Sequence, residues 1–204
     1  MASPTIGVLA LQGDFALHIR ALERLAGERS AIDSVGCSVR KVRLPSDLAG
    51  LDGLVLPGGE STTLVKLAKD YGLFEALRDA ARRGLAMFGT CAGAILLGNG
   101  AEPPERLGIV PVAVQRNAYG RQIDSFEKPI ALEGVPGGPM RCVFIRAPKF
   151  DPALPPEVEV LGKDGQDPIL VRHKRCLLSS FHPELTEDLR VHRLFLEMCR
   201  AGPA

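Results

Sequence analysis

The sequence lacks an excess of charge of either sign. It has 25 Lys and Arg residues against 24 Asp and Glu residues, which gives a formal net charge of +1 at pH 7. Proteins that are drawn to nucleic acid or to anionic membranes by their electrostatic field carry a marked basic excess. The charge balance therefore disfavours nucleic acid and membrane surfaces as partners.

Paired cysteines and long apolar segments are also lacking. The five cysteines are scattered, and no two have the C-x-x-C spacing of a zinc site or a redox dithiol. This usage is typical of a reducing compartment, so we expect a cytoplasmic protein without a metal site. No stretch approaches 18 consecutive apolar residues, and no basic segment precedes an apolar one at the N-terminus. We therefore expect a soluble protein with no export signal.

What is present is a regular alternation of short apolar runs and amphipathic stretches. With 204 residues and 46% hydrophobic content, the chain is long enough for one α/β domain over residues 1–204. Buried strands are predicted at 6–11, 37–44, 53–56 and 85–88, and helices at 15–27, from Ser61 or Thr62 onward, around 74–81 and at 92–97. The alternation predicts a mostly parallel central sheet with helices on both faces.

The second half of the sequence has a different pattern. Short strand-like segments separated by Pro and Gly are predicted at 107–114, 123–126, 140–147, 158–161, 169–172 and 176–180. Their spacing predicts antiparallel additions to the sheet. An amphipathic helix over about 189–199 closes the chain, and residues 28–36 form a surface connection.

One cysteine stands at a predicted sharp turn between a strand and a helix. Gly89 and Gly93 flank Cys91 in the pattern G-x-C-x-G, which is the thiol version of the nucleophile elbow G-x-S-x-G. The glycines leave room for a strained turn that exposes the residue between them, and the helix N-terminus favours an anion there. The pattern alone fits a nucleophile or a buried structural cysteine about equally well.

The second chemical feature is the sequence His182-Pro183-Glu184 after the apolar run 176–181. Proline favours an extended conformation for the residue before it, and residues two apart in extended chain point the same way. Glu184 could then orient the His182 imidazole toward a thiol. By itself, the feature fits a structural histidine and a helix-capping glutamate better.

The third feature is the turn Pro57-Gly58-Gly59-Glu60 at the end of a predicted strand. One N–H group of this turn, together with the N–H of Ala92, could form an oxyanion hole for a tetrahedral intermediate. The alternative is a tight turn without a chemical role. The three features form a strong signal only because they occur together in one chain.

The sequence motifs resemble those of the class I glutamine amidotransferases. The resemblance rests on L-P-G-G-E-S-T at 56–62, G-T-C-A-G at 89–93 and S-F-H-P-E at 180–184. Within that family, the chain is most similar to the glutaminase subunits of pyridoxal 5'-phosphate synthases. That likeness rests on the segments 7–14, 116–126, 144–148 and 182–188 and covers nearly the whole chain.

The resemblance implies a reaction and the residues that carry it. Cys91 would attack the side-chain amide of glutamine, with His182 as base and then acid and Glu184 as its orienter. A glutamyl thioester would form, ammonia would leave, and water would release glutamate. The residues implied around the bound glutamine are Gly58, Gly59, Glu60, Arg116, Ile145 and Arg146, with Gly59 and Ala92 in the oxyanion hole.

The resemblance also implies a partner. Ammonia would pass to a (β/α)₈-barrel synthase subunit in a hetero-oligomeric complex, with pyridoxal phosphate as a product and no cofactor on this chain. Gln12, Gly13 and the following helix are the candidates for the partner-facing surface. Two other interpretations remain open: a glutaminase subunit of another pathway, such as imidazole glycerol phosphate synthesis, and a non-catalytic interaction module of the same fold.

Overall fold

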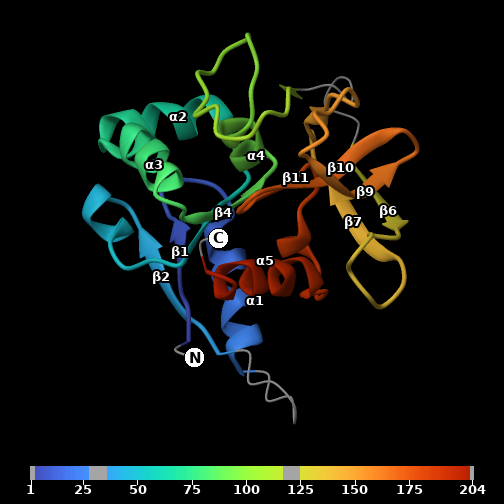
Figure 1. Ribbon diagram of the computed structural model, residues 1–204, viewed down its shortest axis with the longest axis horizontal. Coiled ribbons are helices and arrows are strands. Elements are labelled where there is room, and N and C mark those ends of the chain that lie inside the picture. The colour runs from blue at the N-terminus through green and yellow to red at the C-terminus, as the bar shows by residue number, and fades with distance from the viewer. Residues whose placement is uncertain (1–2, 28–35, 117–124, 203–204) are drawn as a thin grey trace.

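A seven-stranded sheet forms the centre of the computed structural model, which describes residues 3–27, 36–116 and 125–202 (Figure 1). In spatial order its strands are β2 (Ser38–Val42), β1 (Thr5–Leu9), β3 (Gly53–Leu56), β4 (Ala86–Thr90), β11 (Cys176–Ser179), β10 (Asp167–His173) and β9 (Glu159–Asp164). The first five strands run parallel to their neighbours, whereas β10 and β9 are antiparallel additions.

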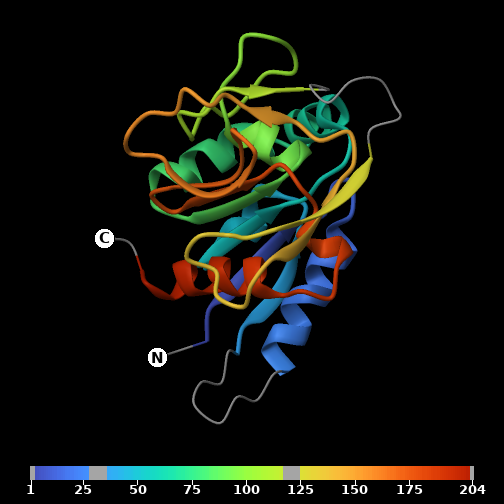
Figure 2. The same cartoon turned by 90° about the vertical axis from the view of Figure 1, so that its right-hand side faces the viewer.

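Helices cover both faces of this sheet. On one face lie α2 (Ser61–Asp70), α3 (Leu73–Arg82) and α4 (Ala92–Leu97), and on the other α1 (Phe15–Gly27) and α5 (Arg190–Arg200). Figure 2 shows the two layers from the side, with the blue α1 and the red α5 together below the sheet. Two short 3₁₀ helices, η1 (Pro45–Leu48) and η2 (Pro183–Leu185), follow β2 and β11.

The strands at the centre of the sheet are buried on both faces. Leu54 and Leu56 of β3 pack toward α2, α3 and α4, whereas Val55 between them packs toward α1 and α5. Met87 and Phe88 of β4 divide between the two layers in the same way. Successive side chains of a strand point to opposite faces, so continuous apolar runs are what a sheet covered on both sides requires.

Two small antiparallel pairs complete the second half of the chain. β5 (Val114–Gln115) pairs with β8 (Lys149–Phe150), and β6 (Phe126–Ile130) pairs with β7 (Met140–Phe144). In Figure 1 the β6–β7 pair extends from the sheet on the side of β9 and β10. Within the described part of the chain, no helix is long and apolar enough to cross a membrane.

The structure confirms the predicted fold class and corrects parts of the element assignment. The strand predicted at 107–114 is wrong except for its last residue, because the N–H groups of Leu107, Ile109 and Val110 donate to carbonyls at the end of α4. The N-cap of α2 is Glu60, and the prediction of Ser61 or Thr62 as the cap is wrong. The Glu60 carboxylate accepts a hydrogen bond from the N–H of Thr63. The predicted surface connection, apart from Gly36, and the start of the strand predicted at 123–126 lie outside the described residues. The single domain predicted for residues 1–204 stays a prediction.

Candidate active site

Cys91 occupies the turn between β4 and α4, in a conformation that few residues adopt. Its backbone has φ 48° and ψ −103°, and it is only 7% exposed. A β-carbon on Gly93 would lie 1.9 Å from the carbonyl oxygen of Leu56, and one on Gly89 would lie 2.6 Å from the carbonyl carbon of Gly93. Only glycine fits at either position, so the elbow inferred from the sequence has a steric basis in the contact of α4 with β3 and β4.

His182 reaches the same end of the sheet from the neighbouring strand. β11 lies parallel to β4 with Ser179 opposite Thr90, so the residues that follow the two strands emerge side by side. The N–H of Cys91 donates to the carbonyl of Ser179 at 2.9 Å, and the N–H of His182 donates to that of Val143 at 2.8 Å. Cys91 and His182 line the same cavity, and the nearby Cys91 raises the pKa of the His182 imidazole.

Glu184 contacts the other side of the imidazole. Nδ1 of His182 lies 2.8 Å from Oε1 of Glu184, and the two residues are only 4% and 6% exposed. Extended geometry after His182 was the wrong reason for predicting this contact. Pro183 begins η2, and this tight turn brings the Glu184 carboxylate back to the ring.

The charges of His182 and Glu184 stabilise each other. Burial by itself lowers the pKa of His182, but the contacts with Cys91 and Glu184 outweigh it and raise this pKa to about 10. Burial raises the pKa of Glu184, but the charges and hydrogen bonds of His18 and His182 outweigh it and hold this pKa well below its usual range. The geometry is that of a nucleophile, a base and an orienting carboxylate.

A cavity of about 220 Å³ opens over the thiol and the imidazole. Five of the six residues predicted around glutamine line it: Gly59, Glu60, Arg116, Ile145 and Arg146. Gly58 does not line the cavity but lies beneath it, where a β-carbon would be 2.5 Å from Cε1 of His182 and 3.4 Å from Cβ of Cys91. The sequence thus located substrate-site residues from three separate loops at one site.

Nearly the whole chain matches one family of known proteins. The model of the SNO glutamine amidotransferase family matches residues 8–201. The chain belongs to this family. The predicted enzyme class, a glutaminase, is thereby confirmed.

Individual members of the glutamine amidotransferase group are similar over nearly their whole length. A protein of Thermus thermophilus named pyridoxal 5'-phosphate synthase subunit PdxT is 52% identical over 197 residues, covering 95% of this chain and 96% of its own. One of the same name from Deinococcus radiodurans is 49% identical over 199 residues, covering 94% and 95%. A crystal structure described as a glutamine amidotransferase is 48% identical, with a TM-score of 0.84 over 96% of this chain and 98% of its own.

A charged pair, Glu60 and Arg116, forms part of the rim of the cavity over Cys91 and His182. Nη2 of Arg116 lies 3.1 Å from Oε1 of Glu60, and Nη1 donates to the carbonyl of Pro103 at 3.1 Å. Partial burial raises the pKa of Glu60, but hydrogen bonds from Thr62 and Thr63 outweigh it and lower this pKa to about 2. A fixed anion beside a fixed guanidinium suits the ammonium and carboxylate groups of an amino acid.

The two residues predicted for the oxyanion hole lie next to the nucleophile. Gly59 has φ 143°, and a β-carbon there would lie 2.7 Å from the side-chain amide of Gln12. This amide donates to the carbonyl of Glu60 and accepts from its N–H, and so holds the turn in place. Ala92 is the first residue of α4, where N–H groups have no partner within the helix. The oxyanion role of Gly59 and Ala92 stays a prediction.

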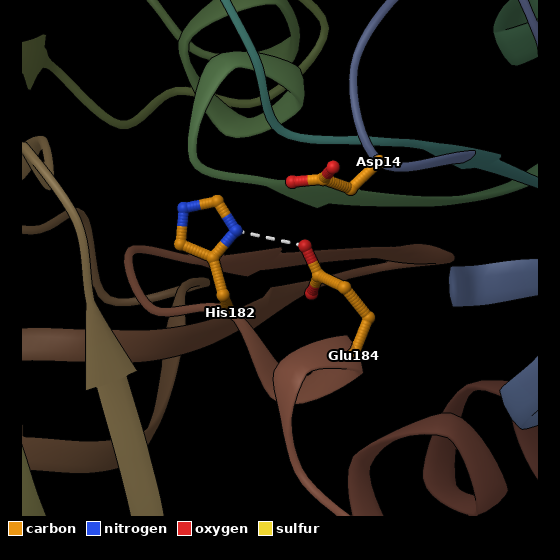
Figure 3. A group of neighbouring side chains, drawn as sticks. All are labelled: Asp14, His182 and Glu184. Carbon is orange, nitrogen blue, oxygen red and sulfur yellow. Dashed lines mark hydrogen bonds and ion pairs between the residues drawn. The ribbon is translucent and has the colours of Figure 1, made fainter. Parts of the chain in front are cut away.

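Asp14 is a site residue that the sequence placed only at a helix start. Its carboxylate is turned toward the imidazole in Figure 3, and it lines the cavity. Ligand atoms of Asp14, His182 and Glu184 lie within 4.8 Å of one another, the one group in the described part of the chain that could hold a metal ion. A metal there would compete for the nitrogen and oxygen that His182 and Glu184 use to contact each other.

Sequence reasoning missed a buried pair of histidines behind Glu184. His18 of α1 and His192 of α5 are both 0% exposed, and their Nδ1 and Nε2 atoms lie 3.0 Å apart. A signal was available, because both histidines stand at core-facing positions of amphipathic helices, where an apolar residue is the usual choice.

Proposed function

We propose that the chain hydrolyses L-glutamine to L-glutamate and ammonia with Cys91 as nucleophile, His182 as general base and acid, and Glu184 as the residue that orients His182. The observation that carries the proposal is that Cys91 and His182 line one cavity while Nδ1 of that imidazole lies 2.8 Å from a buried carboxylate. Membership of a glutamine amidotransferase family supports glutamine as the substrate.

The reaction follows from these positions in two halves. In the first, His182 holds the proton taken from the thiol, the sulfur bonds to the amide carbon of glutamine, and the oxyanion is stabilised by the N–H groups of Gly59 and Ala92. His182 then gives the proton to the amide nitrogen as the carbon–nitrogen bond breaks and ammonia leaves. In the second half, water loses a proton to His182 and attacks the thioester, which releases glutamate and restores the thiol.

The remaining residues of the cavity hold the substrate. Glu60 and Arg116 contact the ammonium and carboxylate groups of glutamine, and the backbone of Ile145 and Arg146 forms the opposite wall. Gly58 keeps the space under the triad free, because any side chain there would collide with His182. Arg146 itself has φ 44°, which turns its backbone sharply at this wall.

The ammonia passes to a pyridoxal 5'-phosphate synthase. Relatives that are about half identical over nearly their whole length carry the name of a subunit of that synthase, and this supports the same role here. The partner is a (β/α)₈-barrel subunit in a hetero-oligomeric complex, and Gln12, Gly13 and α1 face it. All five cysteines are free thiols, which supports action in a reducing cytoplasm.

The test is glutamate release by the chain, alone and with a pyridoxal 5'-phosphate synthase barrel subunit, for the wild type and Cys91→Ala. Cys91→Ala is expected to abolish release while the circular dichroism spectrum stays unchanged. Cys37→Ala is the matched control, because that half-buried thiol lies away from the cavity and burial raises its pKa. Hydrolysis that persists in Cys91→Ala, or that is absent from the wild type even with the synthase subunit, would refute the proposal.

A further inference from the structure

Glu184 has a second carboxylate oxygen that the triad does not use. Oε1 contacts His182, whereas Oε2 is buried and has no hydrogen bond of ordinary length to any described residue. A buried carboxylate oxygen without a donor is costly. The polar atom that approaches it is Nε2 of His18, at 3.5 Å, and both side chains are 0% exposed.

His18 is held in this position from three sides. Its Nε2 also lies 3.1 Å from Oγ1 of Thr90, the residue directly before Cys91, and its Nδ1 lies 3.0 Å from Nε2 of His192. The ring of Phe88 contacts it edge to face, with ring centroids 6.1 Å apart. Elements β4, η2, α1 and α5 therefore meet at this one imidazole.

The second histidine of the pair serves as a neutral support. Burial and, to a smaller extent, the charge of His18 lower the pKa of His192, Glu184 acts in the opposite direction, and the result is a pKa of about 3. His192 is thus uncharged at neutral pH and contributes a hydrogen-bonding nitrogen to His18. The charged and titratable groups that face His18 are Glu184 on η2 and His192 on α5.

We propose that His18 is a positioning residue for glutamine hydrolysis: its Nε2–H fixes the Glu184 carboxylate in the orientation in which Oε1 holds Nδ1 of His182. The inference rests on the proposed function of the Cys91–His182–Glu184 triad. Without the Nε2–H donor, the carboxylate can rotate away from His182, and the imidazole loses the partner that stabilises its charged form. Outer residues that orient the ligands of a metal contribute about 10- to 100-fold to activity, and we expect a loss of similar size here.

Two amide substitutions separate the two nitrogens of His18. The amide of Gln reaches the position of Nε2, so His18→Gln keeps a donor toward Glu184. The shorter Asn reaches only the position of Nδ1, so His18→Asn keeps the contact with His192 and loses the one with Glu184. Leu22→Val controls for loosened packing of α1, because Leu22 is 0% exposed on the same helix and has no polar contact with the triad.

The first measurement is steady-state glutamine hydrolysis in complex with the synthase subunit. His18→Asn is expected to lower kcat roughly 10- to 100-fold with KM within about twofold of the wild type. His18→Gln is expected to retain most of kcat. Equal losses in the two variants, or a kcat for folded His18→Asn equal to the wild-type value, would overturn the proposal.

The second measurement is the pH dependence of Cys91 alkylation by iodoacetamide, which requires neither glutamine nor the partner. In His18→Asn the rise of the alkylation rate is expected at higher pH than in the wild type, because His182 no longer stabilises a thiolate as well. Leu22→Val is expected to lower the Tm without moving this profile, and a fall in Tm without a shift in His18→Asn would overturn the proposal. Failure of the Cys91→Ala test would instead refute the proposed function, so the two failures are distinguishable.

Discussion

Arg116 and Glu60 are fixed before any substrate arrives, and this bears on how tightly glutamine binds. Arg116 is held by Glu60 and by the Pro103 carbonyl, and Glu60 in turn caps α2 through Thr63. A guanidinium in a fixed position loses little side-chain freedom on binding an amino acid, and its planar geometry cannot be reproduced by an ammonium group. We therefore expect the pair to contribute to the KM for glutamine.

Arg116→Lys is expected to raise the KM for glutamine roughly 10- to 100-fold, because hydrogen bonds to charged groups contribute about 1.5–3 kcal/mol. The value of kcat should change only a few-fold, since Arg116 does not contact the triad. The measurement is steady-state kinetics over a range of glutamine concentrations. Arg82→Lys is the control, because Arg82 forms an exposed pair with Asp79 on α3 away from the cavity. An unchanged KM in Arg116→Lys would remove this residue from substrate binding.

Single residues were predictable where a motif constrained them and unpredictable where only packing did. Cys91, His182 and Glu184 belong to short motifs whose spacing carries chemical meaning. His18 and His192 are 174 residues apart, and neither has a local pattern that indicates the other. Asp14 was interpreted only as a helix start. Its position at the cavity was not predictable because it depends on the path of the chain between β1 and α1.

Among the elements, α4 depends most on the absence of a side chain. Its first turn brings Gly93 against the carbonyl of Leu56 at the end of β3, where a β-carbon would lie 1.9 Å from the oxygen. Backbone on both sides leaves nothing flexible to move away. The helix that carries the predicted oxyanion donor can therefore lie where it does only with glycine at this position.

Gly93→Ala is expected to destabilise the protein severely, by about 2–5 kcal/mol or more, because β3 and α4 must separate. Gly27→Ala, at the end of α1, is the matched control: its β-carbon would meet nothing within 4 Å, and Ala favours a helix over Gly by about 1 kcal/mol. Chemical denaturation of both variants measures the difference. A Gly93→Ala variant as stable as Gly27→Ala would show that α4 can move without loss of the fold.

Elements were predicted well where burial on both faces or one helical face set the pattern. The strand 53–56 and the helix 92–97 have the predicted bounds, and α1 has its predicted length. The run at 107–113 was misassigned because its apolar residues pack around the end of α4, and an apolar run by itself does not say which carbonyls its N–H groups will meet. The turn η2 was missed because extended chain was expected to continue from His182 to Glu184.

At the scale of the whole molecule, the buried histidines predict how stability depends on pH. His192 has its pKa lowered to about 3, so between about 6.5 and about 3 the unfolded chain binds more protons and stability falls as pH falls. His182 has its pKa raised to about 10, so its contribution is fully present below about 6.5 and is lost as pH rises through about 10. Together they place the maximum of stability near pH 6.5.

His192→Gln is expected to flatten the acid side of this profile. The Gln amide reaches the position of Nε2 and preserves a contact with His18 Nδ1, but it cannot take up a proton. One group contributes a slope of at most about 1.4 kcal/mol per pH unit. Urea denaturation of the wild type and the variant at pH 5 and pH 7 measures the difference. If the free energy of unfolding changes by the same amount between pH 7 and pH 5 in the wild type and in His192→Gln, His192 is excluded as a source of instability in acid.

The fold class was predictable because it follows from the order of apolar runs along the chain. The order of elements does not predict the position of β11, which lies next to β4 although 85 residues of the chain stand between the end of β4 and the start of β11. Its parallel direction also differs from the antiparallel additions expected of the second half. Without this insertion the sequence motifs would remain at separate places in the molecule.

The late position of β11 in the chain has a consequence for biosynthesis. A ribosome that has made residues 1–175 has delivered Cys91 and the four strands on one side of it, but β4 is still an open edge and no imidazole adjoins the thiol. Only when residues 176–184 emerge can β11 close that edge and deliver His182. Under the proposed mechanism, a nascent chain that lacks these residues releases no ammonia.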